Sequence, residues 1–421
     1  GYGIFYGSGS VGAGGWNIAS TGYAPSTDLV GSLDGLRPAA YLNDPFPNGF
    51  AQAVGNSQGL LSFVGQDITR LFDRAAPLPY NQQWNLSLQR QFGSLLVQAA
   101  YSGSRGVHLG DGAGFQINQL PESALAQGNA LQQLVPNPFF GIVTNPGVLR
   151  SAQVARGQLL RPYPQFGSLT VFNPAAGGST YHGFSAKVER RFAAGLGFLA
   201  SYTTSKNISD APATVGPAAA HQDAYNRRAD RSLVEENIAQ RFTSSVTWEL
   251  PVGRGRKLGM GWSGPLDALA GGWQINALVS MQSGAPLVIT NSPNTARALG
   301  GTQRPNSTGI GAAMDGSVQS RLNGYLNPAA FSAPALYTHG NVSRTLPDAR
   351  GPRGSNIDLS IFKIFTLRES LRLQFRAEMF NATNTPNFGL PNGGFGTANF
   401  GLITGQSNRP RQVQLALRLY F

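Results

Sequence analysis

The sequence of 421 residues contains no cysteine, and only 12% of its residues are charged. The absence of cysteine leaves no disulfide, but it favours neither an envelope nor a cytosolic location. No uninterrupted apolar run approaches the roughly 18 residues that a membrane-spanning helix requires, which excludes a helical membrane protein. The charge content lies far below the roughly 25% typical of soluble domains. An ordinary soluble protein is therefore disfavoured.

Histidine is also scarce. The four histidines, His108, His182, His221 and His339, show no metal-ligand spacing, and no H-E-x-x-H motif is present. No local arrangement supports a Ser-His-Asp triad, although such a set could be assembled from distant residues. We therefore expect a protein without enzyme activity, cofactor or bound metal. The alternative is an enzyme with hydrolase activity.

The net charge of +12 comes almost entirely from arginine, because lysine occurs only at four positions. A basic chain raises the hypothesis of nucleic-acid binding. Here the arginines are scattered rather than clustered with stacking aromatic residues. Attraction to anionic lipid headgroups, or a genomic preference for arginine, explains them equally well, so no nucleic-acid partner is expected.

The final stretch, residues 411–421, alternates strictly between two kinds of side chain. From Val413 to Phe421 every second residue is apolar, while Gln412, Gln414 and Arg418 fall on the opposite face. A strand of about 10 residues with one apolar and one polar face is what a membrane-spanning β-barrel needs. A soluble sandwich strand is the alternative, although it would seldom run so far. We therefore predict an all-β fold, a transmembrane antiparallel β-barrel.

The same alternation recurs along the chain and predicts about ten strands. They cover residues 2–6, 82–91, 95–101, 184–189, 196–205, 242–250, 273–283, 357–361, 371–379 and 411–421. The connections between them are alternately short or moderate and long. This parity is typical of a barrel with short periplasmic turns and long extracellular loops.

The long connections are expected to be irregular, apart from a short helix over residues 121–127. Gly7–Gly12 formally matches the G-x-G-x-x-G pattern of dinucleotide-binding proteins. That motif requires a helix at its third glycine, but Gly14 and Gly15 follow, so we interpret it as a loop. Residues up to about 79 are expected to remain irregular.

Two sets of side chains are candidates for function on such a barrel. The residues expected to face the lumen are Asp358, Arg372, Gln374, Arg376, Glu378 and Arg418. We expect them to form a structural ladder of ion pairs on the wall rather than to contact a solute. The aromatic residues expected at the two membrane interfaces are Trp248, Trp273 and Phe421 at the periplasmic ends, and Trp84, Tyr101 and Tyr202 at the outer ends. A set of core aromatic residues is the alternative.

Several segments resemble one family of membrane proteins. Residues 375–389, with the sequence FRAEMFNATNTPNFG, resemble the TonB-dependent outer-membrane receptors, and in particular their Oar-like subgroup. Further matching segments are GYGIFY at residues 1–6, QWNLSLQR at 83–90, YHGFSAKVERRF at 181–192 and LNPAAF at 326–331. The terminal phenylalanine, with apolar residues at every second position before it, is similar to the C-terminal signature of bacterial outer-membrane proteins.

The resemblance implies that residues 1–421 are the C-terminal part of a barrel of about 22 strands, without the plug domain or TonB box. Because the chain starts in mid-domain without a signal peptide, we expect a fragment or a processed piece. Energy coupling would then reside elsewhere. The implied partners are outer-membrane lipid, the barrel assembly machinery through the C-terminal strand, and the TonB complex through the missing N-terminal part.

The function expected from this resemblance is TonB-dependent uptake of a scarce solute across the bacterial outer membrane. The alternative is a surface adhesion or structural barrel without transport, because long loops could also serve cell contact. No residue pattern identifies the solute.

Overall fold

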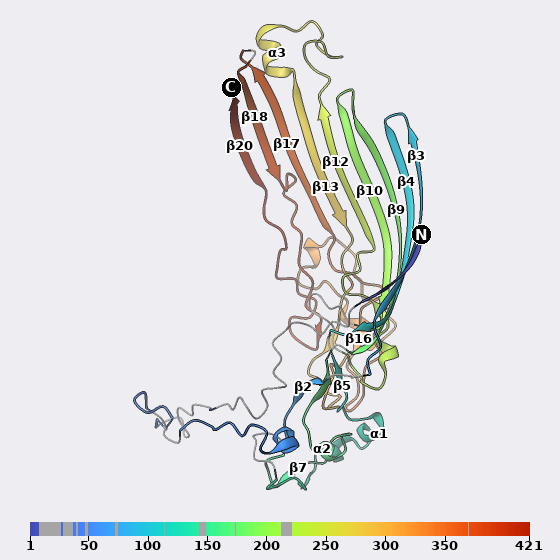
Figure 1. The fold of residues 1–421 in the computed structure, drawn as a ribbon, viewed down its shortest axis with the longest axis vertical. Helices are drawn as coiled ribbons and strands as arrows, with labels where there is room; N and C mark the ends of the chain where they lie inside the picture. The colour runs from blue at the N-terminus through green and yellow to red at the C-terminus, as the bar shows by residue number, and fades with distance from the viewer. Residues whose placement is uncertain are drawn as a thin grey trace.

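The computed structural model describes residues 1–7, 27, 37–38, 41–46, 49–71, 75–112, 114–142, 149–172, 174–211, 221–368 and 370–421. Most of the G-x-G-x-x-G stretch predicted as a loop lies outside the described residues. In Figure 1 one large sheet runs along the longest dimension of the molecule, and most of the remaining chain gathers at one end of it.

The sheet follows the order β1-β3-β4-β9-β10-β12-β13-β17-β18-β20, and every pair of neighbours along it is antiparallel. Its strands are β1 (Tyr2–Tyr6), β3 (Tyr80–Phe92), β4 (Leu95–Gly110), β9 (Ala175–Ala193), β10 (Leu196–Ser209), β12 (Gln240–Glu249), β13 (Trp273–Gln282), β17 (Gly354–Thr366), β18 (Arg372–Phe380) and β20 (Gln412–Tyr420). A short strand, β11 (Ser232–Leu233), pairs with β10 off this path. The predicted antiparallel sheet of about ten strands is confirmed.

Several strands extend beyond their predicted ends. β4 continues to Gly110 instead of ending at Tyr101, and β9 begins at Ala175 instead of Phe184. These extensions are rich in glycine and serine, so they lack the apolar alternation that identifies a strand. Cross-strand pairing between β4 and β9 nevertheless continues from Leu95 to Gly110, because an antiparallel ladder depends on backbone groups rather than on side-chain polarity.

The register gives the sheet two chemically distinct faces. One row of cross-strand neighbours is apolar and consists of Phe198, Val246, Ala277, Leu359, Met379 and Val413. On the opposite face, one row consists of Ser201, Thr243, Ser280 and Asn356. We call these the apolar face and the polar face. Because side chains alternate across a strand, matching registers carry each chemistry from strand to strand.

The apolar face is open at the last strand. Leu415 is 67% exposed and Leu417 is 69% exposed, and no second sheet or helix layer of the described chain covers them. A soluble sandwich would bury these side chains against another layer. The interpretation of β20 as a soluble sandwich strand is therefore wrong.

Short and long connections lie at opposite ends of the sheet, as Figure 1 shows. At the short-turn end, β3 joins β4 and β9 joins β10 through tight turns, and β12 joins β13 through a connection that contains α3 (Gly264–Ala270). The longer segments before β9, β12, β17 and β20 gather at the other end, which we call the long-loop end. The predicted parity of the connections is confirmed.

The long connections contain regular structure that the sequence does not predict. They form small sheets of their own, in the orders β2-β8-β5, β6-β7, β15-β16 and β14-β19. Their strands are β2 (Ile68–Leu71), β5 (Phe115–Gln116), β6 (Leu134–Pro136), β7 (Gln153–Ala155), β8 (Leu169–Val171), β14 (Thr290–Asn291), β15 (Asn306–Ser307), β16 (Phe331–Ser332) and β19 (Gly394–Phe395). The predicted helix near residues 121–127 is present as α1 (Glu122–Leu125). The segment before residue 79 contains η2 (Gly59–Phe63) and β2, so the expectation that it is wholly irregular was wrong.

The remaining short helices are η3 (Gly128–Gln132), α2 (Arg156–Leu159), η4 (Arg227–Asp230), η5 (Gln319–Arg321) and η6 (Pro328–Ala330). None of the helices in the described part of the chain has both the length and the apolar character that a transmembrane helix requires.

Three hydrophobic cores lie within the described parts of the long connections. The largest includes Leu287, Ile289 and Leu326, which precede β17, and Ile403, which lies between β18 and β20. The second is built around Leu120, Leu131 and Tyr337, and the third around Leu149 and Val154. We call this folded part of the long-loop end the outer layer.

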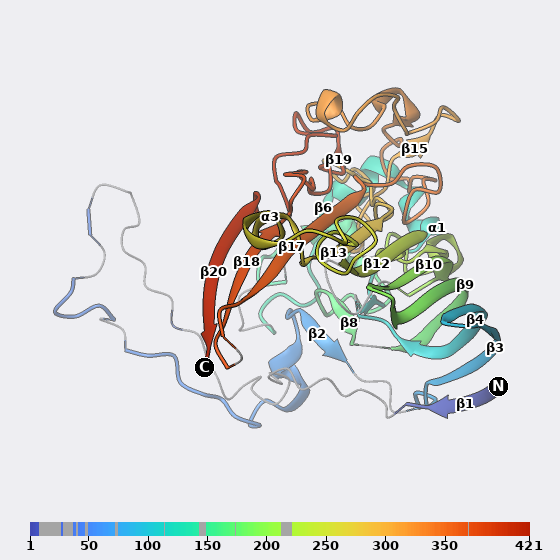
Figure 2. The same ribbon diagram turned by 90° about the horizontal axis from the view of Figure 1, so that it is seen from above.

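The sheet has two edges, β1 and β20, which lie far apart in the view from above (Figure 2). β1 pairs only with β3, and β20 pairs only with β18, among the strands that the structure describes. The described sheet is therefore an open, curved wall rather than a closed barrel.

Candidate functional site

The side chains predicted to face a lumen share the polar face. Gln374 lies opposite Arg418 in the pairing of β18 with β20, and Glu378 lies opposite Ser360 in the pairing of β17 with β18. The strand alternation puts Arg372 and Arg376 on the same face of β18. Asp358 lies opposite Leu278 and joins this face from β17. That the face borders a water-filled bore stays a prediction.

The contacts on this face form only part of the expected ion-pair ladder. The Arg376 Nη1 lies 3.4 Å from the Glu378 Oε1, and the Arg376 guanidinium lies 4.5 Å from the centre of the Phe362 ring. A second ion pair between residues two positions apart joins Lys187 and Glu189 on β9, at 2.8 Å. Both pairs lie within one strand, so the described ion pairs do not tie neighbouring strands of the wall together.

The other charged residues of the predicted set have different partners. The Arg418 guanidinium lies 4.9 Å above the Tyr420 ring, and the Tyr420 hydroxyl donates to the Gln374 Oε1 at 3.2 Å. The Asp358 Oδ1 accepts a hydrogen bond of 2.8 Å from the Asn381 backbone. Asp358 also lines a shallow pocket of about 270 Å³ with Leu199 and Leu278. The polar face therefore has an apolar spot in mid-wall.

The predicted interface aromatic residues lie near the ends that were expected for them. At the long-loop end, the Tyr101 hydroxyl is 2.7 Å from the His182 Nδ1, and the Trp84 Nε1 donates to that hydroxyl at 3.5 Å. Tyr202 lies opposite Phe242, near the start of β12. The three residues thus belong to the half of the wall nearer the outer layer. Their contact with lipid headgroups stays a prediction.

At the short-turn end, Trp248 and Trp273 flank the connection that contains α3. The Trp273 Nε1 donates to the Leu269 carbonyl at 2.8 Å, and its ring meets Phe375 edge-on at 6.0 Å. Phe421, the last residue, is 99% exposed.

Lys363 is a buried cation on the apolar face, which the sequence did not suggest. It lies opposite Trp273, and only 4% of it is exposed. Its ammonium group donates to the Gly271 carbonyl and, at 3.3 Å, to the Asp267 carbonyl. The Lys363 Nζ also lies 5.4 Å from the Trp273 ring. Carbonyl groups at a helix C-terminus attract a positive charge, so α3 satisfies this lysine.

Four asparagines form an asparagine clamp at the long-loop end of the last three strands: Asn381, Asn384, Asn387 and Asn408. Asn381 and Asn384 adopt positive φ angles of 49° and 51°, which asparagine tolerates better than most residues. The Asn381 Oδ1 accepts from the Thr385 backbone at 2.9 Å. The Asn384 Oδ1 accepts from the Arg411 backbone at 3.0 Å. These contacts connect the end of β18 to the segment that enters β20.

The second half of the asparagine clamp reaches β17. The Asn387 Oδ1 accepts from the Ser355 backbone at 2.9 Å, and the Asn387 Nδ2 donates to the Ser355 carbonyl at 3.0 Å. The Asn408 Oδ1 accepts from the Asn387 backbone at 2.8 Å, while its Nδ2 donates to the Thr385 carbonyl at 2.9 Å. Three of the four asparagines lie in the sequence FRAEMFNATNTPNFG at residues 375–389. This segment therefore has a structural role.

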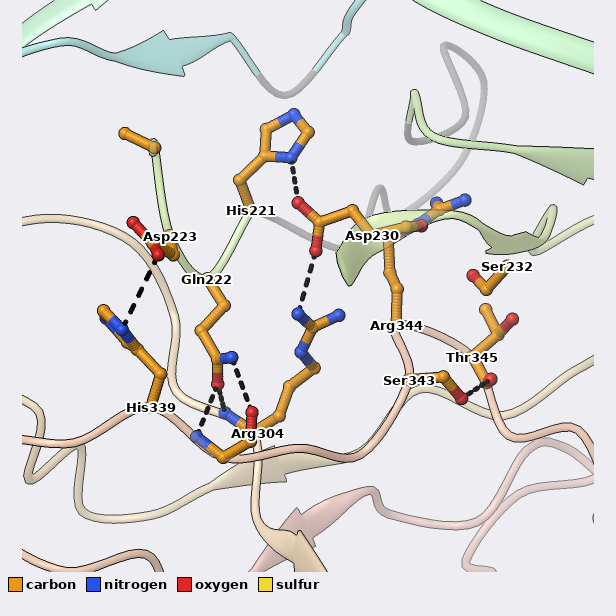
Figure 3. A network of polar contacts seen from close by, with 12 residues as sticks. His221, Gln222, Asp223, Asp230, Ser232, Arg304, His339, Ser343, Arg344 and Thr345 are labelled. Atoms are coloured by element: carbon orange, nitrogen blue, oxygen red, sulfur yellow. Dashed lines mark hydrogen bonds and ion pairs between the residues drawn. The ribbon is translucent and has the colours of Figure 1, made fainter. Parts of the chain in front are cut away.

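A buried ionic network joins three long connections in the outer layer (Figure 3). His221 lies between two carboxylates: its Nδ1 is 2.6 Å from the Asp230 Oδ2, and its Nε2 contacts the Asp111 Oδ2. Asp230 also pairs with Arg304 at 3.0 Å. Asp111 and Asp230 are fully buried, and His221 is 7% exposed. Charges buried this deeply require partners, and here each carboxylate has one.

Burial by itself lowers the pKa of His221, but its hydrogen bonds to Asp111 and Asp230 outweigh burial and raise the pKa to about 9. The imidazole is therefore charged at neutral pH. Burial lowers the pKa of Arg304, although Asp230 opposes this effect. The network thus combines opposite charges in a site from which water is largely excluded.

Arg344 extends the network to the sheet. Its Nε donates to the Asp230 carbonyl at 3.0 Å, its Nη2 donates to the Ser209 carbonyl at 2.9 Å, and its Nη1 binds the Glu235 carboxylate. Ser209 is the last residue of β10. Arg344, which is 1% exposed, therefore fixes the outer layer to a strand of the wall.

Gln222 completes these links. Its Nε2 donates to the Gly340 carbonyl at 2.8 Å, and its Oε1 accepts from the Arg304 backbone at 2.6 Å. The sequence does not reveal this network, because its members come from separate connections without periodicity. Within the described residues, no group of three histidine, aspartate or glutamate side chains is suited to hold a metal ion. The contacts of the network join three connections to one another and to β10, so it acts as a structural fastening.

A family model described as "Outer membrane beta barrel domain" matches residues 1–414. A comparison with curated protein sequences finds no match.

Among solved structures, the chain resembles the ferripyoverdine receptor of the outer membrane of Pseudomonas aeruginosa, bound to ferripyoverdine, at 9% identity with a TM-score of 0.35. That match covers 82% of this chain and 27% of the receptor. The outer membrane transporter YddB from Escherichia coli matches at 11% identity with a TM-score of 0.38, over 84% of this chain and 34% of the transporter. The chain thus spans roughly a third or less of the length of these neighbours.

Proposed function

Since the chain belongs to the family of outer membrane β-barrel domains, we propose that it forms the C-terminal part of an Oar-like, TonB-dependent transporter. Membership of this family locates the chain in the bacterial outer membrane. The apolar face then contacts lipid, the short turns lie in the periplasm, and the outer layer lies outside the cell.

The observation that carries this proposal is the polar face of the wall, together with the folded outer layer at its long-loop end. Polar rows cross the wall from β10 to β17, where Ser201, Thr243, Ser280 and Asn356 are successive neighbours. A solute-conducting barrel requires such an interior, because the bilayer core offers no hydrogen-bond partners. A barrel that served adhesion alone would not require a water-filled bore.

The open edges support the assignment to part of a larger barrel. β1 and β20 each have one pairing partner among the described strands. Unpaired backbone groups in hydrocarbon are costly, so further strands must complete the barrel. In the proposed transporter these strands, together with the plug and TonB box, belong to the rest of the protein.

In this proposal the outer layer captures a scarce solute, and the plug opens the bore when the TonB complex pulls on it. The chain catalyses no reaction. Its own residues provide the wall, the outer surface and the fastening between them through Arg344 and Asn387.

Uptake assays test the proposal. We expect deletion of the full-length gene to abolish growth on one or more scarce solutes, and deletion of the TonB component to reproduce the same defect. Complementation with the full-length gene should restore growth in the first strain but not in the second. Loss of surface adhesion with normal growth on every solute would support the adhesion alternative and contradict transport.

A further inference from the structure

A basic pocket lies where the segment between β13 and β17 meets the outer ends of these two strands. Its volume is about 280 Å³, and its lining includes Arg321, Arg353, Tyr325, Met314, Val318 and Asp348. Ser283, which directly follows β13, and Arg353, which directly precedes β17, both contribute to it. The pocket is therefore at the outer mouth of the wall.

The walls of the pocket are held by hydrogen bonds. The buried Tyr325 donates its hydroxyl to the Arg350 carbonyl at 2.9 Å. The Arg350 guanidinium binds the Asn237 carbonyl at 2.8 Å and the Asn237 Oδ1 at 3.0 Å. Arg350 is thus engaged in supporting the pocket.

Two other arginines supply its positive charge. The Arg321 guanidinium lies 4.6 Å above the Tyr325 ring and donates to the Met314 carbonyl at 2.5 Å, so its plane is held in one orientation. Arg353 is exposed and forms no hydrogen bond or ion pair with any residue that the structure describes. A planar guanidinium with free N–H groups is suited to bind a carboxylate through two parallel hydrogen bonds.

One carboxylate in the pocket limits the charge of a ligand. The Asp348 Oδ2 accepts from the Ala312 backbone at 2.8 Å, which holds the side chain in place. A second negative charge on the ligand would meet repulsion from Asp348. Met314 and Val318 provide apolar surface for the remainder of the ligand.

We propose that this pocket binds a small organic monoanion, with its carboxylate on Arg321 and Arg353 and its apolar part on Met314 and Val318. The volume lies just below the range of about 300–1,000 Å³ that holds drug-sized ligands, so the ligand is small. This inference rests on the proposed function only in treating the ligand as a solute to be imported.

Binding of benzoate to the full-length protein in detergent micelles, measured by saturation-transfer NMR, tests the pocket without any uptake. Benzoate should bind, and its neutral analogue benzamide should not. Arg353→Ala should weaken benzoate binding at least about tenfold, equivalent to about 1.4 kcal/mol. Because Arg353 is exposed and forms no hydrogen bond or ion pair with any described residue, this substitution should leave the fold intact.

Two further variants make the test specific. Arg321→Lys keeps the charge but loses the planar guanidinium, so it should also weaken binding. Arg409→Ala removes an equal charge at the long-loop end without touching the pocket, and it should bind benzoate as the wild type does. Absence of wild-type binding, equal binding of benzamide, or an unaffected Arg353→Ala variant would each overturn the inference.

The two proposals can fail separately. Benzoate binding that depends on Arg353, in a protein whose uptake is independent of TonB, would support the pocket and contradict the proposed function. TonB-dependent uptake by a protein that does not bind benzoate would do the reverse.

Discussion

Asn387 pairs with Ser355 through its side chain as a neighbouring strand would through its backbone. The amide Oδ1 accepts from the Ser355 N–H at 2.9 Å, and the amide Nδ2 donates to the Ser355 carbonyl at 3.0 Å. The pairing of β17 with β18 reaches only to Leu359 and Met379 at this end. The amide group thus completes a hydrogen-bond ladder beyond the end of the strand that would otherwise supply it.

Asn387→Ala should therefore destabilise the barrel. The substitution leaves both backbone groups of Ser355 without these partners, at a cost of about 1–3 kcal/mol. The measurement is the urea concentration at which the protein, folded in lipid vesicles, loses the compact mobility of a folded barrel on a gel. Asn387→Asp keeps the acceptor but not the donor, so its midpoint should fall between those of the wild type and the alanine variant. Equal midpoints for all three proteins would contradict this role.

Arg344→Ala should loosen the outer layer from the wall. It removes the bonds to Ser209 and Asp230 and leaves Glu235 without its cation, and breaking a buried pair in this way costs about 3–5 kcal/mol. Faster amide hydrogen exchange in the outer layer, with unchanged exchange in β12 and β13, is the expected result. Arg228→Ala, which removes an exposed arginine nearby, is the control and should exchange as the wild type does.

The outer layer should become less stable as the pH rises above neutrality. The pKa of His221 is raised from an ordinary value of 6.5 to about 9. The protonated side chain therefore contributes fully to the stability of the outer layer below pH 6.5, and this stabilisation is lost as the pH rises through 9. In that window the loss amounts to at most about 1.4 kcal/mol per pH unit.

Hydrogen exchange in the outer layer, corrected for its intrinsic pH dependence, measures this effect. The exchange should accelerate between pH 7 and pH 10 in the wild type. His221→Gln should be less stable at pH 7 and should lack this acceleration. A wild-type profile without acceleration would show that His221 does not carry its charge as the geometry implies.

Two neighbouring residues of β20 should differ in how strongly the same substitution destabilises the protein. Leu415 belongs to the apolar face and Ala416 to the polar face. Leu415→Arg places a charge in lipid near the middle of the strand, at a cost of up to about 2–4 kcal/mol, whereas Ala416→Arg should cost much less. The yield of folded protein in lipid vesicles compares the two variants. A lower yield for Ala416→Arg than for Leu415→Arg would reverse the assignment of the faces.

The wall could be predicted from the sequence because each of its strands is identified by the pattern of its own residues. Each strand such as β20 carries alternating side chains, and the short turns follow directly from the ends of adjacent runs. Strand ends were predicted less well where glycine and serine replace apolar residues, as at Gly106 and Gly177, because pairing there is a property of the backbone.

The outer layer could not be predicted because its contacts join residues that are far apart in the sequence. Ile289 and Ile403 lie in one hydrophobic core but are far apart in the sequence, and neither belongs to a periodic segment. His221 meets Asp111 across 110 positions. The predicted lumen residues lie on one face, but their partners differ from the expected ladder of ion pairs. The guanidinium groups of Arg376 and Arg418 lie over the aromatic rings of Phe362 and Tyr420.

Lys363 gives the wall a fixed vertical position. Its ammonium group is held by carbonyl groups of the connection that contains α3, at the short-turn end of the apolar face. Displacing the protein outward would carry this charge, together with the polar connection that contains α3, into the acyl chains. Lys363 and α3 together therefore indicate where the hydrocarbon core of the bilayer ends on this side of the wall.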